Sequence, residues 1–291
     1  MNTSLITLQN ADLSLVIAAH GAELRSLGER NTNDEYIWQR DPAFWPASAP
    51  ILFPVIGRMK DGGYTLDGKF YEIPKHGFTR EMDFSILASS ESAATFRLVD
   101  TAETRAAFPF AFSLEVDFRL VARTLEVDYR VQNRADREMP FGLGSHPAFT
   151  LPPSMGPLTD WSIGFDTVEP PTCSRVAENL LASTLVPFTY SADNAIELTD
   201  KTFEHDALIF KSLRSKRVQL RHRTQGTRLT FDTGGAPTLG IWAKPGAPYV
   251  CLEPWCGFDD SSEINTDLFA KPALMRLAAG GTFTTGYKVT V

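Results

Sequence analysis

The sequence has 291 residues, of which 43% are hydrophobic and 22% are charged, and its formal net charge is −7. These proportions are ordinary for globular proteins and provide enough apolar residues for a sizeable core, which excludes a disordered chain. The acidic balance argues against a basic nucleic-acid-binding surface and against binding to anionic membranes, so we expect neither partner. We expect a single domain over residues 1–291, present as a monomer or a homodimer.

The N-terminal stretch and the cysteines indicate the compartment. Met1–Asp12 has no positive charge, apolar block or small-residue cleavage site, so we expect no signal peptide. No apolar run approaches the roughly 18 residues of a membrane span. The three cysteines, Cys173, Cys251 and Cys256, are too few and odd in number for a disulfide framework. We therefore expect a cytoplasmic protein with reduced thiols.

Short strands begin the chain, and an aromatic loop follows them. Residues 4–27 are rich in β-branched and aliphatic residues between breaks at 10–12 and 20–21, which predicts short strands. Residues 36–46 contain two prolines and cannot form a long helix or a central strand. Trp38, Phe44 and Trp45 in this loop either pack it onto the protein or stack on the C–H face of a sugar.

A hairpin then separates two groups of cations. An apolar run over 49–58 ends at Arg58, and Asp67-Gly68 predicts a tight turn in the hairpin that follows. His76 and Arg80 come directly after the hairpin, so we expect them to converge with Arg58. The alternative is that the arginines are solvated surface residues.

The remaining elements are also mostly strands. Residues 100–108 predict one short helix that Pro109 stops, and residues 112–131 predict a long antiparallel hairpin with one buried face. Residues 151–198 predict only loops and short strands. Three further features follow: a strand directly after Asp206, a hairpin over 218–231 and a strand over 239–242. We expect a turn and a last strand pair over 272–291.

His146 is the first candidate for chemistry. It lies in the stretch Phe141–Phe149, with two glycines before it and Pro147 after it, where the backbone is tightly specified. Its unperturbed pKa of about 6.5 suits proton transfer at neutral pH. The alternative is a buried histidine that a backbone carbonyl satisfies at a strand end.

Glu253 is the second candidate. It interrupts Tyr249–Trp255, a run that is apolar at nearly every position and predicts a strand buried on both faces. A buried carboxylate is costly unless it is paired or functional. We expect Pro254 to end the strand and to place the carboxylate at the mouth of the sheet.

Three common site types are not indicated. The sequence has no metal-binding His-x-His, His-Glu-x-x-His or Cys-x-x-Cys pattern, so we expect no metal and no other cofactor. Gly144-Ser145-His146 lacks the nucleophile elbow of a serine hydrolase, and no glycine-rich phosphate loop is present. A histidine with a carboxylate remains, and such a pair can protonate one oxygen while deprotonating another.

An ordered set of short motifs over nearly the whole chain resembles the aldose 1-epimerase (galactose mutarotase-like) family, and within it the branch of LacX-like proteins and hexose-6-phosphate mutarotases. The motifs are Leu52-Phe53-Pro54, Gly57-Arg58, His76-Gly77-Phe78-Thr79-Arg80, Gly144-Ser145-His146-Pro147-Ala148-Phe149, Asp206-Ala207-Leu208 and Leu252-Glu253-Pro254-Trp255. The resemblance implies an all-β supersandwich of stacked antiparallel sheets and cofactor-free interconversion of the anomers of a hexose or hexose 6-phosphate.

The resemblance also implies residue roles. His146 would protonate the ring oxygen, and Glu253 would accept the proton of the C1 hydroxyl. The residues implied to hold the sugar are Arg58, His76, Arg80 and Asp206. Lys75 departs from the family pattern, because relatives often carry glutamine there.

Two questions remain open: whether the sugar carries a phosphate, and whether the protein is an enzyme. Arg58, Lys60 and Arg80 would form a local positive mouth that favours a phosphorylated sugar. A non-catalytic carbohydrate-binding protein of the same fold is the alternative to an enzyme.

Overall fold

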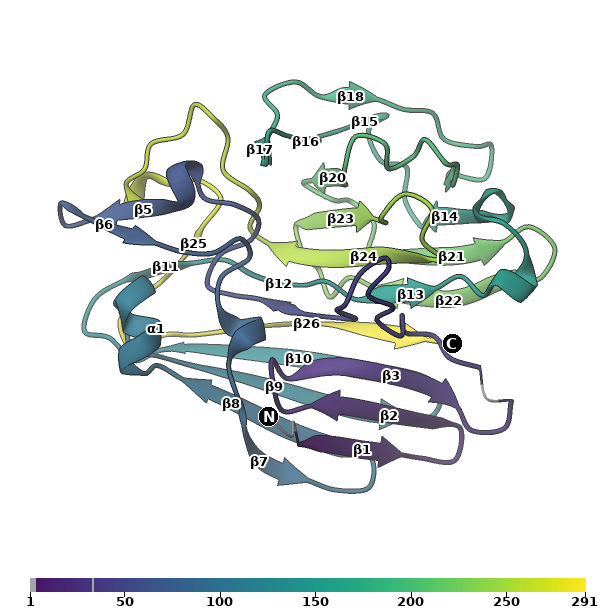
Figure 1. Cartoon of the computed structure of the whole chain (residues 1–291), viewed down its shortest axis with the longest axis horizontal. Coiled ribbons are helices and arrows are strands. Elements are labelled where there is room, and N and C mark those ends of the chain that lie inside the picture. The colour runs from purple at the N-terminus through teal and green to yellow at the C-terminus, as the bar shows by residue number, and fades with distance from the viewer. Residues whose placement is uncertain (1–3, 33) are drawn as a thin grey trace.

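Antiparallel β-strands make up most of the computed structural model, which describes residues 4–32 and 34–291 (Figure 1). Residues 1–3 belong to the stretch in which we expect no signal peptide, and they lie outside the described residues. The strands form several sheets packed against one another, and nearly all pair with their neighbours in antiparallel register. The predicted all-β fold of stacked antiparallel sheets is confirmed.

The largest sheet has nine strands, and the predicted long hairpin lies within it. Alternation of apolar and polar residues gives the two hairpin strands one buried and one solvent-facing side. In spatial order the sheet comprises β19 (Ala195–Glu197), β14 (Trp161–Phe165), β21 (Arg217–His222), β22 (Gly226–Asp232), β26 (Thr282–Thr290), β10 (Thr124–Asn133), β9 (Phe112–Val121), β8 (Ala93–Val99) and β7 (Ser85–Ser89).

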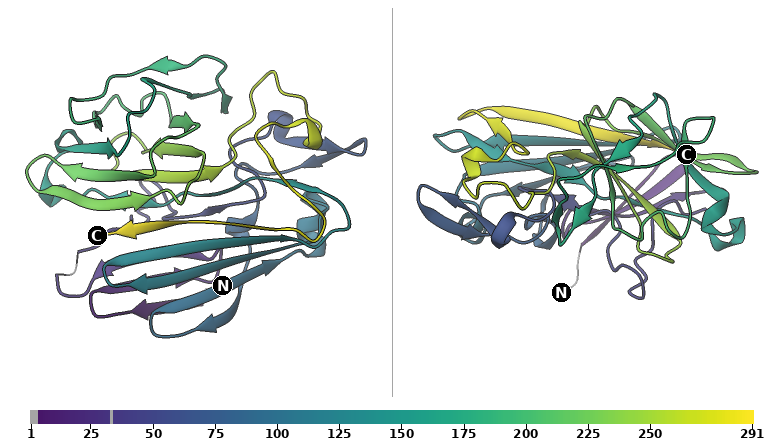
Figure 2. Two further views of the ribbon diagram at one scale, coloured as in Figure 1. Left: turned by 180° about the vertical axis from the view of Figure 1, so that it is seen from behind. Right: turned by 90° about the horizontal axis from the view of Figure 1, so that it is seen from above.

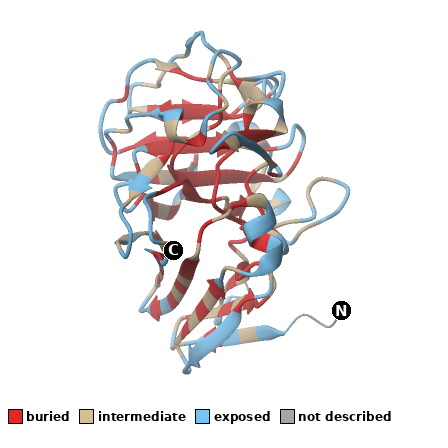
Figure 3. Cartoon of the chain, turned by 90° about the vertical axis from the view of Figure 1, so that its left-hand side faces the viewer, coloured by how far each residue is buried: buried red, intermediate tan, exposed pale blue. Residues whose placement is uncertain are grey.

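A second sheet of six strands lies across the middle of the molecule. Its strands are β20 (Leu208–Lys211), β23 (Thr238–Trp242), β24 (Tyr249–Cys256), β12 (Leu143–Ser145) and β4 (Ile51–Leu52), and β13 (Ala148–Thr150) also pairs with β24. All eight residues of β24 are buried, as the apolar run predicts. Figure 3 shows this contrast as buried ribbons in the middle of the molecule and alternating burial in the long strands below.

The prediction that Pro254 ends β24 is wrong. The strand continues to Cys256, and Pro254 and Trp255 pair with Leu239 and Thr238 of β23. A proline removes only its own donor, and the residues on both sides keep the ladder intact. Glu253 therefore lies inside the sheet, opposite Gly240, rather than at its mouth.

A third sheet is formed by the N-terminal strands β1 (Leu5–Gln9), β2 (Leu13–Ala18) and β3 (Glu23–Glu29), as predicted. Figures 1 and 2 show it beside the β7–β10 part of the nine-stranded sheet. Four strand pairs complete the sheets: β5 (Gly63–Leu66) with β6 (Lys69–Glu72), β11 (Met139–Phe141) with β25 (Met275–Leu277), β15 (Thr172–Cys173) with β18 (Val186–Pro187), and β16 (Val176–Ala177) with β17 (Leu180–Leu181).

Helices are short. The predicted helix is α1 (Ala102–Ala107), and Thr101 caps its N-terminus by accepting a hydrogen bond from the Thr104 N–H. The 3₁₀ turns are η1 (Lys60–Gly62), η2 (Thr79–Glu81), η3 (Pro153–Met155), η4 (Leu158–Asp160) and η5 (Leu268–Ala270). Over residues 4–32 and 34–291, none of the helices has the length and apolar character needed to cross a bilayer.

The C-terminal strands differ from the expectation in one respect. Both exist, but β25 pairs with β11, and β26 pairs with β10 and β22 instead of with β25. Leu125 of β10 lies opposite Val289 of β26, and both are buried in the main hydrophobic core, so this pairing buries the apolar face of β26. All three cysteines are free and buried, which fits the expected reduced thiols.

Candidate active site

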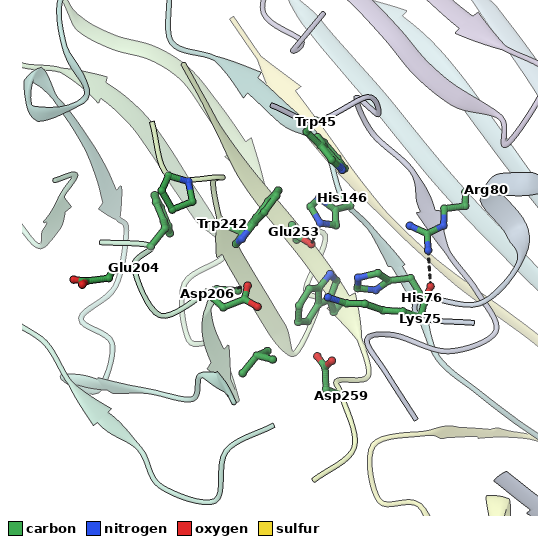
Figure 4. A pocket seen from close by; sticks show the side chains of 15 residues that line it. Trp45, Lys75, His76, Arg80, His146, Glu204, Asp206, Trp242, Glu253 and Asp259 are labelled. Carbon is green, nitrogen blue, oxygen red and sulfur yellow. Dashed lines mark hydrogen bonds and ion pairs between the residues drawn. The ribbon is translucent and has the colours of Figure 1, made fainter. Parts of the chain in front are cut away.

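A pocket of about 420 Å³ opens on one face of the six-stranded sheet, and it contains most of the residues predicted to act (Figure 4). Glu253 and Trp255 line its floor from alternate positions of β24, which share one face of the strand. Side chains at Gly144 and Gly240, on the two neighbouring strands, would lie within 3.0 Å of the Trp255 ring. These two glycines therefore leave room for the indole across the sheet.

His146 follows directly after β12 and is held from both sides. Its backbone N–H donates to the Pro50 carbonyl at 3.0 Å. Its ring lies against Trp45, with centroids 4.8 Å apart and an interplanar angle of 34°, and edge-on to Trp242 at 5.7 Å. Trp45 is itself anchored, because the Trp38 indole N–H donates to its carbonyl at 2.8 Å. The packing fixes the imidazole at the pocket wall.

His146 and Glu253 meet at the pocket floor. The distance from His146 Nε2 to Glu253 Oε2 is 3.2 Å, and the two side chains are 12% and 2% exposed. The contact is short enough for an ion pair, but its alignment does not make a hydrogen bond, and Glu253 Oε2 and His146 Nδ1 have no hydrogen-bond partner among the described residues. Buried polar atoms are normally paired, so atoms left free in a pocket point to a ligand.

The protonation of this pair follows from its burial. Burial raises the pKa of Glu253 well above its usual range, and the nearby Lys75 ammonium only partly opposes this effect. Burial also lowers the pKa of His146 to about 3. When the pair carries one proton in total, burial therefore favours the form in which Glu253 holds it and His146 is neutral.

His76 lies beside His146, with ring centroids 5.9 Å apart. Its backbone φ is +66°. The ring nitrogen Nδ1 of His76 accepts a hydrogen bond from the Gly57 N–H at 2.9 Å, and the backbone N–H of His76 donates to the Gly57 carbonyl at 2.7 Å. The proton of the neutral ring is therefore on Nε2, which makes that nitrogen a donor. Burial, together with neighbouring positive charges, lowers the pKa of His76 well below its usual value and keeps the ring neutral.

Three further carboxylates line the pocket, and of these Glu204 is exposed. Asp206 lies just before β20, and its Oδ1 accepts from the Ala207 N–H at 2.8 Å. Asp259 follows β24, is 3% exposed and accepts from the Arg58 N–H at 3.0 Å. A side chain at Gly57 would lie 1.9 Å from the Asp259 carboxylate, so the turn at Gly57 leaves space for this acid. Burial raises the pKa of Asp259.

The predicted group of cations is only partly assembled at the pocket. Arg80 lines it, and its Nη2 donates to the Lys75 carbonyl at 2.6 Å. Arg58 is exposed and lies outside the lining, and the Lys60 ammonium points to the Ile264 carbonyl at 3.4 Å. Lys75 extends into the pocket instead, beside His76, so the second cation differs from the expectation (Figure 4).

Several pocket residues carried no recognisable signal in the sequence. Asp259 is an acid in a loop, and Trp242 closes a strand in which an aromatic residue is ordinary. Lys75 differs from the family pattern, but nothing in its local sequence indicates a pocket residue. The one available signal for Asp259 was its position six residues after Glu253, just beyond the same buried strand.

The pocket floor also contains a set of metal-ligand types. His146, Cys251 and Glu253 each offer one ligand atom, and these atoms lie within 4.8 Å of one another among the described residues. No local metal-binding pattern in the sequence indicates this set, because Cys251 and His146 lie far apart along the chain. Antiparallel pairing of β13 with β24, which places Ala148 opposite Cys251, brings the two regions together.

Comparisons with known proteins agree with this fold. The aldose 1-epimerase family model matches residues 4–287. Chromosomal protein LacX of Lactococcus lactis subsp. lactis is 29% identical over 309 residues, which cover 98% of this chain and 99% of LacX.

Two solved structures are similar over nearly the whole chain. A galactose mutarotase related enzyme from Lactobacillus acidophilus has 34% identity and a TM-score of 0.93, covering 99% of this chain and 97% of its own. A galactose mutarotase-like protein from Lactobacillus casei ATCC 334 has 31% identity and a TM-score of 0.91, covering 99% of both chains. The protein therefore belongs to the aldose 1-epimerase family, as the ordered motifs predict.

Proposed function

We propose that the protein interconverts the α and β anomers of a hexose, with His146 and Glu253 as the acid and base. One observation carries the proposal: the two groups lie 3.2 Å apart at the floor of a pocket large enough for a sugar ring. The ring oxygen and the C1 hydroxyl of an aldose are attached to the same carbon. An acid and a base that must address both oxygens therefore have to be neighbours.

The proposed reaction needs one proton on the pair. Glu253, as a carboxylate, accepts the proton of the C1 hydroxyl while His146, as an imidazolium, donates to the ring oxygen. The bond between C1 and the ring oxygen breaks, and C1 becomes an aldehyde carbon. The pair is then a carboxyl group and a neutral imidazole, which is the tautomer that burial favours.

Reclosure restores the starting state. After rotation about the C1–C2 bond, the C5 hydroxyl attacks C1 from the other face and gives its proton to His146. Glu253 returns its proton to the carbonyl oxygen. The protein regains its original protonation, and the chemistry requires no added cofactor.

The other pocket residues would hold the sugar. His76 offers its Nε2–H as a donor, Asp206 and Asp259 offer carboxylate oxygens, and the rings of Trp45 and Trp242 suit the C–H faces of a sugar. Arg58, implied by the resemblance to contact a hydroxyl, is exposed outside the lining, so we leave it out of the proposed binding set.

We further propose that the pocket accepts the hexose in its 6-phosphorylated form as well as in its free form. Arg80 and Lys75 line the pocket together, and an arginine fork can meet two phosphate oxygens at once. Glu204, Asp206 and Asp259 line the same pocket and would repel a phosphate placed beside them. The phosphate would therefore have to lie on the Arg80 side.

A substrate panel tests this proposal. Freshly dissolved α-glucose and α-galactose are followed by polarimetry, and glucose 6-phosphate is followed by NMR exchange between anomers, each with and without protein. We expect acceleration over the spontaneous reaction. A protein that binds these sugars without accelerating exchange would instead be a carbohydrate-binding protein of the same fold.

A further inference from the structure

We propose that His146, Cys251 and Glu253 form a zinc site, and that Zn²⁺ bound there reversibly blocks the active site. The binding part stands on the geometry of these three side chains. The inhibitory part rests on the proposed function, because the metal would occupy the proposed acid and base.

The position of Cys251 makes the site possible. It lies two residues before Glu253 on β24, so both side chains project from the same face of the strand. Trp242 of β23 and Ala148 of β13 pair with Cys251 on its two sides, and His146 precedes Ala148 by two residues. The three ligand atoms consequently lie within 4.8 Å of one another.

The set of donors matches zinc. A thiolate, an imidazole and a carboxylate are all zinc ligands, at about 2.0–2.3 Å from the metal, and three protein ligands leave one position open. Here the open position would face the pocket, where a water molecule completes the coordination. Mg²⁺ and Ca²⁺ prefer sites built from oxygen alone, so a thiol and an imidazole select against them.

The pocket around these three side chains contains both acidic and basic residues, and this balance permits a cation. Asp206 and Asp259 line the same pocket and favour positive charge, whereas Lys75 and Arg80 oppose it. Glu253 Oε2 and His146 Nδ1 lack hydrogen-bond partners among the described residues, so binding breaks no hydrogen bond of these two atoms. Metal binding releases two protons to solvent, one from the Cys251 thiol and the one that the His146–Glu253 pair carries.

Occupation of this site would stop catalysis. Zinc takes the lone pair of His146 and the carboxylate of Glu253, so neither group can transfer a proton to or from the sugar. A hexose and Zn²⁺ would therefore compete for the same pocket, and a chelator would restore the rate.

Cobalt spectroscopy on tag-free protein provides the test. Co²⁺ bound to a thiolate shows a charge-transfer absorption in the near ultraviolet, which reports Cys251 as a ligand without any reference to turnover. We expect this band in the wild type, and we expect Zn²⁺ to abolish it by displacement. Cys256→Ala is the matched control, because Cys256 is a buried cysteine on the same strand but points to the opposite face.

The variant Cys251→Ala should lose the band, and its affinity for Zn²⁺ should fall by at least about tenfold, since loss of even an outer partner of a metal ligand costs 10- to 100-fold. It should keep sugar turnover but lose zinc inhibition, and Cys256→Ala should keep both. Absence of the cobalt–thiolate band in the wild type, or equal zinc affinity in Cys251→Ala and wild type, would overturn the proposal. If turnover is absent altogether, the band still decides the binding claim, and only the proposed function fails.

Discussion

The two large sheets differ in where their charged side chains lie and in how these are paired. On the nine-stranded sheet, charges lie on the solvent side and pair across strands, as Arg97 does with Glu115 and Lys288 with Glu126, both at 2.6 Å. On the six-stranded sheet, Glu253 lies in a fully buried strand and its Oε2 lacks a hydrogen-bond partner among the described residues. Paired charges on an exposed face are ordinary surface structure, whereas a buried acid that lies beside a histidine and has an oxygen without a hydrogen-bond partner indicates a site.

The largest expected effect comes from removing the acid or the base. Glu253→Gln and His146→Ala should each lower the rate of anomer exchange by roughly 100- to 10,000-fold, as is usual for a positioned proton-transfer group. Glu126→Gln, which changes a paired glutamate on the nine-stranded sheet, is the control and should keep the rate. A folded Glu253→Gln protein with near wild-type exchange would remove Glu253 from the mechanism.

The second prediction contrasts two lysine–carboxylate pairs in stability. Lys271 and Asp260 form an ion pair that is buried on both sides, and Asp260 also accepts from the Lys60 N–H at 2.9 Å. Lys271→Met leaves this carboxylate without its counter-charge and should lower the free energy of unfolding by roughly 3–5 kcal/mol. Lys288→Met, in the half-exposed pair with Glu126, should cost at most about 1 kcal/mol. Chemical denaturation compares the two, and equal losses would contradict the distinction between buried and exposed ion pairs.

The third prediction concerns the charge of the substrate. Arg80→Ala should raise KM for glucose 6-phosphate by roughly 10- to 100-fold, the value of a lost charge-assisted hydrogen bond, and leave any activity on free glucose nearly unchanged. Added salt should weaken the binding of the phosphorylated sugar more than the binding of the free sugar. Because Arg80 also holds the Lys75 carbonyl, Arg80→Lys serves as a control that keeps the charge. Equal losses on both sugars would leave an enzyme for free hexoses.

The smallest predicted effect is a shift of the pH–rate profile. Activity requires one proton on the His146–Glu253 pair. The rate should therefore fall at low pH, when the pair gains a second proton, and at high pH, when the pair loses its only proton. The Lys75 charge lowers the pKa of both residues. Lys75→Gln should therefore move both limbs of the profile to higher pH, after subtraction of the uncatalysed rate. Limbs that stay in place would show that Lys75 lies too far from the pair to act on it.

The sequence predicts the local features of this molecule well. Alternation of apolar and polar residues gives the β9–β10 hairpin, Asp67-Gly68 gives the turn between β5 and β6, and Pro109 marks the end of α1. The buried run around Glu253 also predicts a fully buried strand. Each of these signals depends on residues close together in the chain.

The features that could not be predicted depend on distant parts of the chain. The continuation of β24 past Pro254 requires β23 to hold the ladder, and β25 finds its partner in β11 rather than in the neighbouring β26. Lys75, Asp259 and Cys251 carry no local signal, and only the packing of separate strands and loops brings them to one pocket floor. The local sequence marks His146 and Glu253 as candidates, and the resemblance to a family supplied their separate roles as acid and base.

Exchange spectroscopy on the wild-type protein tests the central claim most directly. In a two-dimensional NMR exchange experiment on glucose at anomeric equilibrium, catalytic amounts of protein should produce cross-peaks between the α and β C1 protons at mixing times too short for spontaneous mutarotation. The same amount of Glu253→Gln should produce none. Broadened glucose lines without cross-peaks in the wild type would show binding without turnover, and would contradict the assignment of His146 and Glu253 as a catalytic pair.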